Sequence, residues 1–206
     1  MARPVNANAK ETRGRILDKA LFLFSEAGVD GASIRQISAA SQVSVAMVHH
    51  YFGSKEGLYE ACIDAMYAEL MELQGTLKPL LLRHDGSRDL LERLVREYSR
   101  FARAHSRSIR LLLRNVMDRG ELDAQRREQY QIPVLKAGAQ LLAPVLGRDP
   151  VDLQLHIQST MHLVVRYAVT NPEELGRLSG VEGSENEILQ HVEDHLVSVA
   201  FRIFDL

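Results

Sequence analysis

Two short helical patterns joined by a tight turn occupy residues 33–55, SIRQISAASQVSVAMVHHYFGSK. In the second pattern, about residues 44–50, Val48 has an inward position, together with Val43 before it and Phe52 after it. The outward positions carry small apolar, imidazole and phenol side chains: Val45, Ala46, Met47, His49, His50 and Tyr51. A short helix with such an outer face suits the major groove of DNA, so the chemistry expected is non-covalent recognition of a duplex.

Patterns typical of catalysis do not accompany this segment. The sequence has no glycine-rich phosphate loop, no G-x-S-x-G turn and no pair of cysteines. His191 and His195 have the i, i+4 spacing that could hold a metal ion, but HVEDH matches neither H-E-x-x-H nor H-x-x-E-H. A solvated or interface histidine pair is therefore favoured over a metal site. We expect neither an enzyme nor a bound cofactor.

Composition predicts an all-α protein of the cytoplasm. Of the 206 residues, 46% are hydrophobic and 25% are charged, which is enough apolar material for a core. Leu, Ala, Arg and Glu dominate, and alternating strand patterns with Asn-Gly or Asp-Gly turns are missing. The single cysteine, Cys62, excludes an intrachain disulfide. No apolar run reaches the ~18 residues of a membrane span, and a signal-peptide hydrophobic region is missing.

Charge is distributed unevenly along the chain. The formal net charge is −2, but residues 1–55 hold seven Lys and Arg against four Asp and Glu. That segment therefore carries +3, and the remaining residues carry −5. Phosphate binding requires local positive charge rather than a basic chain overall, so this modest asymmetry favours a nucleic-acid partner for the N-terminal part.

The N-terminal part is expected to fold as a flexible arm, residues 1–9, followed by a three-helix DNA-binding domain, residues 10–55. Its first helix, residues 10–27, has one apolar face and ends at Gly28 as a left-handed cap. That face consists of Ile16, Ala20, Leu21, Phe24 and Ala27. Ser33, with Gln36 in capping-box position, and Ser44 are expected to cap the next two helices.

The rest of the chain, residues 56–206, is expected to form a helical domain for effector binding and dimerisation. A fourth helix, residues 54–73, leads into it. Further helices are expected over 87–104, 106–117, 121–143, 149–170 and 185–204, with a short one over 172–178. Breaks are expected at 75–79, 84–86, 120, 144–150 and 171–184. Pro133 predicts a kink or break within the 121–143 pattern.

Four motifs lie at fixed offsets from one another within about residues 12–60. They are Ile16-Leu17-x-x-Ala20-x-x-x-Phe24-x-x-x-Gly28, Gly31-Ala32-Ser33-Ile34-Arg35-x-Ile37, Val43-Ser44, and Tyr51-Phe52-x-Ser54-Lys55-Glu56-x-Leu58. This combination resembles the TetR/AcrR family of transcriptional regulators, and its last motif looks like the subgroup that includes the RutR- and CecR-type regulators. The resemblance implies a two-domain, all-helical homodimer. Such a protein binds a palindromic operator and releases it when a small molecule enters the C-terminal domain.

The resemblance also assigns DNA-facing positions residue by residue. These are Ser33, Arg35, Ser44, Val45, Ala46, Met47, His49, His50, Tyr51 and Lys55. Arg35 is the best candidate for a contact with guanine or phosphate, whereas His50, Tyr51 and Lys55 suit phosphates. The two serines could present backbone N–H groups to phosphates as well as cap their helices, and Tyr51 could instead pack against the first helix.

Three positions depart from the family pattern. Gln42 stands where the turn residue is usually Gly, so a left-handed backbone there would cost free energy. Ala46 replaces a small residue that is often Gly, and His49 stands where many members place a tyrosine against the phosphate backbone. These departures bear on the operator sequence and on pH sensitivity rather than on the fold.

A small-molecule site is expected between helices of the C-terminal domain, where helical bundles commonly bind ligands. Its candidate residues put polar tips among apolar neighbours, although each also suits an ordinary core or surface role. They are Tyr98, Phe101, Met117, Tyr130, His156, Met161, His162, Arg166 and Tyr167. His162 and Arg166 lie one turn apart and could offer two donors to an anionic or carbonyl-bearing ligand.

An apolar stripe on the last helix predicts a dimer interface. The stripe contains Ile188, Val192, His195 or Leu196, Val199 and Ile203. Together with the preceding helix it would make a four-helix bundle between two protomers, although the stripe could instead pack within one protomer. Dimerisation also has a functional reason, because two recognition helices about 34–36 Å apart can read a palindrome.

These observations predict a homodimeric repressor that binds double-stranded DNA. A small-molecule effector releases the repressor from the DNA. The ligand would shift the helix around 106–117, and the 54–73 helix would carry that shift to the recognition helices. A transcriptional activator or a ligand-independent regulator fits the same residues. A helical enzyme fits them less well, because it would not require the +3 charge of residues 1–55.

Overall fold

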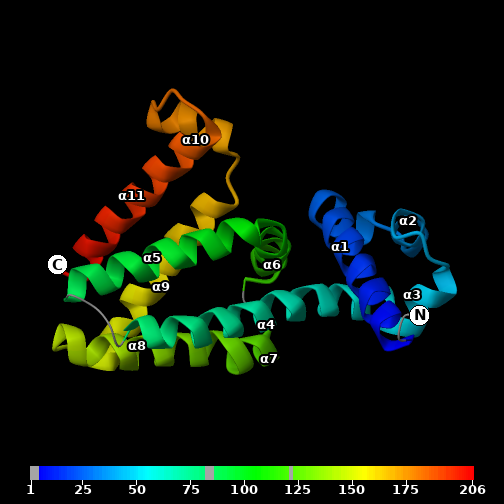
Figure 1. Ribbon diagram of the computed structural model, residues 1–206, viewed down its shortest axis with the longest axis horizontal. Helices are drawn as coiled ribbons and strands as arrows, with labels where there is room; N and C mark the ends of the chain where they lie inside the picture. Colours follow the sequence, from blue (N-terminus) through cyan, green and yellow to red (C-terminus); the bar gives the residue numbers. More distant parts are fainter. Residues whose placement is uncertain (1–4, 82–85, 121–122) are drawn as a thin grey trace.

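The computed structural model describes residues 5–81, 86–120 and 123–206, and these residues contain helices but no strand. The all-α prediction is therefore confirmed for this part of the chain. Figure 1 shows a small helical unit at the N-terminal end and a larger bundle at the other, joined by the long helix α4 (Lys55–Leu81). None of the described helices combines the length and the hydropathy that a membrane crossing requires.

Three helices and the start of α4 form the N-terminal unit. The three are α1 (Val5–Gly31), α2 (Ile34–Ala40) and α3 (Val45–Phe52). Ile16, Ala20 and Phe24 of α1 are fully buried, as are Ile37 of α2 and Leu58 of α4. Phe24 also meets Tyr59 of α4 edge to face, with ring centroids 6.3 Å apart. The three-helix arrangement thus depends on α4 to close its core.

The boundaries of this unit differ from the predicted ones at both ends. Helix α1 begins at Val5, so part of the segment predicted as a flexible arm is helical; residues 1–4 lie outside the described residues. Ala27, predicted on the buried face, is exposed. Gly28 has φ 76° and ψ 170°, so it ends the first regular stretch with a positive φ but not as the predicted left-handed cap. Phe52, predicted as core, is only partly buried.

The larger bundle is built from the second half of α4 and the elements that follow. These are α5 (Ser87–Ala104), α6 (Ser106–Arg119), α7 (Ala124–Arg126), the π-helical turn η1 (Arg127–Gln131), α8 (Ile132–Leu146), α9 (Pro150–Ala168), α10 (Pro172–Ser179) and α11 (Glu185–Ile203). Helix α9 packs against α8, α5 and α11, and α11 also packs against α5 and α10. In Figure 1, α5 and α11 diverge above α4 and α8.

The predicted interruptions of helices at prolines are confirmed at one position and wrong at two. The kink expected at Pro133 is confirmed, because η1 interrupts the pattern directly before α8, whose first turn contains this proline. The breaks predicted at 75–79 and at 144 are wrong. Helix α4 continues to Leu81 and α8 continues through Pro144 to Leu146, so neither helix ends where its proline was expected to end it. Residues 84–85 and 121–122 lie outside the described residues.

A buried carboxylate joins α5 to α11. The side chain of Glu193 on α11 is only 4% exposed, and it accepts hydrogen bonds from Arg103 at 2.8 Å and from Arg96 at 3.3 Å. Arg100 lies 3.8 Å from the same carboxylate. A carboxylate removed from water requires such partners, so this network holds α11 in one register against α5.

We predict that Glu193→Gln destabilises the protein by about 3 kcal/mol, near the low end for removing one partner of a buried ion pair. The side chains of Arg96 and Arg103 are 23% and 26% exposed, which moderates the loss. Urea unfolding followed by circular dichroism measures the change. The control is Glu97→Gln, which removes an exposed pair with Arg100 and costs ~1 kcal/mol or less. Equal losses for the two variants would contradict the assignment.

Candidate nucleic-acid interface and internal cavity

Both predicted serine caps are present in the α2–α3 pair. Ser33 accepts a hydrogen bond from the backbone N–H of Gln36 at 3.3 Å, and the Gln36 side chain accepts one from the Ser33 N–H at 2.9 Å. Ser44 accepts from the N–H of Met47 at 3.1 Å. These bonds satisfy first-turn donors and fix where the two helices begin. Both serines remain accessible, so the phosphate contacts predicted for them stay a prediction.

The turn between α2 and α3 is held by three features. Gln42 has φ 56°, the left-handed conformation predicted for this position. The fully buried Ser41 donates its hydroxyl to the carbonyl of Ile37 at 2.6 Å. From α1, Arg15 donates its Nε–H to the Ser41 carbonyl at 2.8 Å, a contact that the sequence did not predict. The turn is thereby fixed to the longest helix of the N-terminal unit.

The outer face of α3 is open to solvent. Val48 is 1% exposed and anchors the helix, while Val45 is 37% and Met47 41% exposed. Ala46, His49 and His50 are exposed as well. This division between one buried anchor and a free outer face is what the sequence predicts for a helix that enters a groove. The DNA contacts themselves stay a prediction.

Two of the predicted DNA-facing residues, Tyr51 and His49, have internal partners. The Tyr51 ring is partly buried and lies against both Phe52 and His50, with centroids 6.1 and 5.4 Å away. His49 Nδ1 lies 2.8 Å from the Gly53 carbonyl, so this nitrogen carries the proton. In the neutral ring the other nitrogen is then an acceptor, and a contact with phosphate requires a doubly protonated ring.

The charge of the α2–α3 segment is entirely positive. Residues 31–55 contain Arg35 and Lys55 but no Asp or Glu. Arg35 is exposed on the first turn of α2, and Lys55 is the first residue of α4. An exposed surface with cations and no carboxylate attracts polyanions such as the DNA backbone.

The junction between α3 and α4 is very close. A β-carbon built on Gly57 would lie 2.2 Å from the Phe52 carbonyl oxygen, so only glycine fits there. Ser54 caps α4 by accepting from the Gly57 N–H at 3.0 Å. The end of α3 and the start of α4 therefore move as one piece.

Further along the chain, the α7–η1 segment contacts α4 at two places. The buried Arg126 guanidinium donates to Glu60 and lies 3.5 Å from Asp64. Tyr130 stacks on Tyr67 of α4 with ring centroids 4.4 Å apart, and burial raises the pKa of the Tyr67 phenol to about 12. Helix α8 follows directly after this segment, so these contacts join α4 to the start of α8.

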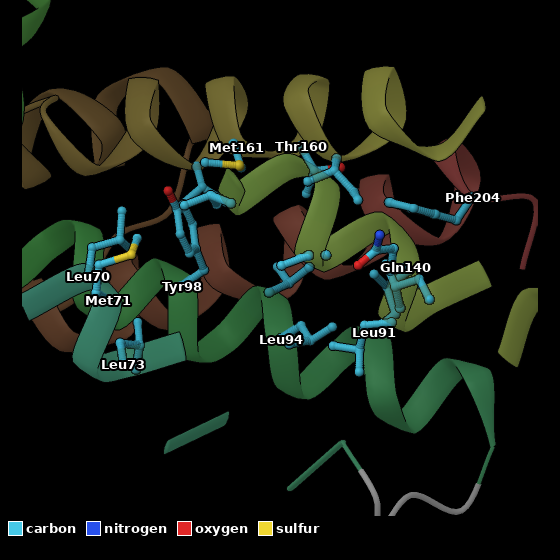
Figure 2. A pocket seen from close by; sticks show the side chains of 18 of the residues that line it. Leu70, Met71, Leu73, Leu91, Leu94, Tyr98, Gln140, Thr160, Met161 and Phe204 are labelled. Atoms are coloured by element: carbon cyan, nitrogen blue, oxygen red, sulfur yellow. The ribbon is translucent and has the colours of Figure 1, made fainter. Parts of the chain in front are cut away.

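A cavity of about 630 Å³ lies between α4, α5, α8 and α9. Figure 2 shows Leu70 and Met71 of α4, Leu91 and Leu94 of α5, and Phe204 beyond α11 on its walls. This volume lies within the range of roughly 300–1,000 Å³ that small-molecule sites occupy. The cavity was predicted in this domain, but most of its lining was not.

Only Tyr98 and Met161 of the predicted effector residues line this cavity. The others have different surroundings. Phe101 stacks on His105, Tyr130 on Tyr67, and His156 and Tyr167 lie against Phe204 and His195. Met117 is 84% exposed on α6, and His162 and Arg166 are exposed on α9, where they bond to Gln158 and Thr170. His162 and Arg166 therefore do not line this cavity, and the two-donor site suggested for them stays a prediction.

The apolar stripe of α11 packs within the protomer. Ile188, Val192 and Leu196 are buried on the side where α11 meets α5, α9 and α10. Val199 and Ile203 are partly buried and His195 is exposed beside Tyr167 of α9. These residues fit the alternative that the stripe packs within one protomer, because hydrophobic periodicity shows that a face is buried but not against what. A dimer contact of the stripe stays a prediction.

A different apolar surface, on α9, is exposed to solvent. We call the exposed side of α9 with Val151, Leu155 and Leu163 the α9 outer face; Leu155 is 76% exposed. His195 of α11 lies next to it through Tyr167. His191 and His195 are exposed, and the described residues contain no group of three or more side chains placed to hold a metal ion.

Comparisons with known proteins agree with this geometry. The family described as bacterial regulatory proteins, tetR family, matches residues 16–62. The chain is 36% identical over 70 residues to the HTH-type transcriptional repressor NicS of Pseudomonas putida, covering 34% of this chain and 33% of NicS. It is 33% identical over 98 residues to the repressor Rv3405c of Mycobacterium tuberculosis, covering 48% of each. The chain thus spans a third to a half of the length of these relatives.

A solved structure extends the likeness of the fold to the whole chain. A TetR-like transcriptional regulator from Rhodococcus sp. RHA1 superposes with a TM-score of 0.65 and 23% identity, covering 98% of this chain and 97% of that one. The predicted RutR- and CecR-type subgroup stays a prediction, because none of these proteins bears on it.

The left-handed turn residue provides a test of this geometry. We predict that Gln42→Gly raises the free energy of unfolding by about 0.5–1 kcal/mol, because relief of the left-handed strain exceeds the entropy cost of glycine. Thermal unfolding measures the gain. The control Gln42→Ala keeps a β-carbon and should give no gain, so equal effects of the two substitutions would refute the strain.

Proposed function

We propose that this chain, whose residues 16–62 match the family of bacterial regulatory proteins, tetR family, is a DNA-binding transcriptional repressor that acts as a homodimer. It reads a palindromic operator in the cytoplasm with two copies of α3 in the major groove. A small molecule in the α4–α5–α8–α9 cavity releases the operator. The main support is the exposed outer face of α3, in a segment with cations and no carboxylate.

Repression is favoured over the other interpretations by the relatives. NicS and Rv3405c are named as repressors, whereas an activator or ligand-independent regulator would use the same DNA-binding face. A helical enzyme gains no support from proteins that are named as regulators. Gel-shift titration of the chain on the DNA next to its own gene tests the proposal. A shifted band that carries two protomers is expected, and no shift even at low salt would contradict it.

In this proposal the residues of the α2–α3 pair divide into two roles. Val45, Ala46 and Met47 offer apolar contacts, for example to thymine methyl groups, and so contribute to sequence preference. Arg35 binds guanine or phosphate at the start of α2. Lys55, His50 and Tyr51 bind phosphates and position the protein without reading sequence.

We place the dimer contact on the α9 outer face, continued by the exposed side of α11 around His195. Three apolar side chains there lack cover in the protomer. Two helices from each protomer would form a four-helix bundle, the arrangement expected from the sequence, but with α9 rather than the buried α11 stripe supplying its apolar centre. The dimer holds the two α3 helices at the spacing of successive major grooves.

The coupling between cavity and operator runs through α4 in this proposal. At 27 residues and 1.5 Å per residue, α4 is about 40 Å long. Its second half supplies cavity residues such as Leu70, and its first residue follows the close junction with α3. Helix α6, predicted to carry the shift, supplies no cavity residue among those described but touches α1, where Arg107 lies 5.3 Å from the Phe22 ring. A coupling of ~1–3 kcal/mol between effector and operator is typical.

We expect Lys55→Ala to weaken binding to all DNA sequences alike and to reduce the salt slope of the logarithmic binding constant by about one. The reason is the loss of one phosphate contact. Fluorescence anisotropy over a series of salt concentrations measures both effects. Lys136→Ala is the matched control, because Lys136 is exposed on α8 in the other domain. An unchanged salt slope for Lys55→Ala would exclude this contact.

Leu155→Glu should raise the dissociation constant of the dimer by at least about tenfold, because it places an unpaired carboxylate in an apolar contact. Sedimentation velocity over a range of concentrations measures it. The control Met117→Glu changes an equally exposed apolar side chain on α6 and should leave the dimer intact. A Leu155→Glu protein that remains as dimeric as the control would rule out the α9 outer face.

A further inference from the structure

We infer that the cavity between α4, α5, α8 and α9 takes an uncharged, largely aliphatic ligand that carries one hydrogen-bonding group near Tyr98. Its role as the effector rests on the function proposed above. The chemical class of the ligand, however, follows from the cavity alone.

Charge on the cavity wall is the first argument. The described residues that line it include no Asp, Glu, Lys, Arg or His. Bringing a carboxylate or an ammonium group out of water without a partner costs far more than burying a neutral polar group. The lining therefore selects against anionic and cationic ligands, including the anionic ligand that His162 and Arg166 were expected to bind.

The apolar walls are the second argument. Leucine, valine, isoleucine and methionine side chains from four helices supply most of the surface, among them Leu94 and Ile157. A ligand that binds against these aliphatic walls gains binding free energy in proportion to the apolar area that is removed from water. Gly138 on α8 lets this helix pack closely on α9, because a β-carbon there would lie 3.3 Å from the Ile157 side chain. A hydrocarbon chain matches this surface.

The polar groups are few and lie at separate places. In Figure 2 the Tyr98 hydroxyl lies at the end with Leu70, Met71 and Met161, and the Gln140 amide lies at the opposite end near Phe204. The Thr160 hydroxyl already donates to the His156 carbonyl at 2.9 Å. The cavity is thus elongated, with one polar group at each end.

Tyr98 is the group that a buried ligand would have to satisfy. Its hydroxyl has no hydrogen-bond partner among the described residues. Burial raises the pKa of this phenol well above its usual range, so it stays neutral and acts as a donor. An unsatisfied donor in an apolar site costs free energy that a ligand carbonyl or ether oxygen would recover. Gln140, which is exposed, marks the end that meets solvent.

Calorimetric titration of the full chain with four probes of one chain length tests the ligand class. The probes are methyl decanoate, decanol, decanoate and decylammonium, each below its aggregation concentration. The two neutral probes should bind, and the two charged probes should bind at least about tenfold more weakly. Decanoate or decylammonium binding as tightly as methyl decanoate would overturn the inference, and so would no binding by either neutral probe.

Two variants locate the binding and separate it from an effect elsewhere on the protein. Tyr98→Phe should weaken methyl decanoate binding by about two- to tenfold, the value of one hydrogen bond. Ala137→Phe fills the cavity from α8 and should abolish binding, whereas Ala104→Phe at an exposed site of α5 should not. Unchanged binding in Ala137→Phe or in Tyr98→Phe would refute the site.

The proposed function and this inference fail in different experiments. The calorimetric result is measured without DNA, so a failed gel shift leaves the ligand class standing. Conversely, methyl decanoate that binds but does not release DNA would contradict its role as effector and not its place in the cavity. Tight binding of decanoate alone would refute the ligand class while an effector-responsive repressor could still hold.

Discussion

Helix α4 belongs to two parts of the hydrophobic core at once, and the rest of the structure depends on this sharing. Near its start, Leu58 and Ile63 are fully buried, and α4 packs against α1 and α3. Near its end, Leu70 lines the cavity of the bundle. At Gly57 the start of α4 lies directly against the end of α3. In the proposed coupling, a change in the cavity that tilts α4 displaces α3, since releasing the helix from either core would lose apolar burial.

The bundle is organised by a polar contact as much as by apolar packing. The three arginines of α5 around Glu193 fix α11 with its apolar stripe turned inward. Because that stripe is buried within the protomer, the exposed apolar surface that we propose for contact with a second copy lies on α9. The same packing puts aliphatic side chains from four helices around a cavity whose described walls carry no charge. Interface and ligand chemistry thus follow from one arrangement of helices.

Local features of the chain were accessible from the sequence. The caps at Ser33 and Ser44, the left-handed backbone at Gln42 and the inward position of Val48 were all predicted correctly. Each depends on residues within one or two turns of chain, where side-chain hydrogen bonds, φ preferences and periodicity operate. The α2–α3 pair and its outer face could therefore be predicted from the amino acids alone. Helix ends at prolines could not, because a proline can also lie inside a helix, as Pro144 does in α8.

The sequence by itself determined the all-helical class, the starts of the short helices and the side chains that α3 presents to solvent, because these are set by neighbours in the chain. Only the tertiary structure decided which helices surround the cavity, that His162 and Arg166 lie outside it, and that Ile188, Val192 and Leu196 face α11's own protomer. The physical reason is that an apolar face specifies burial but not a partner. The partner is chosen by how whole helices pack, and by long-range contacts such as Glu193 with Arg103 that no local pattern encodes.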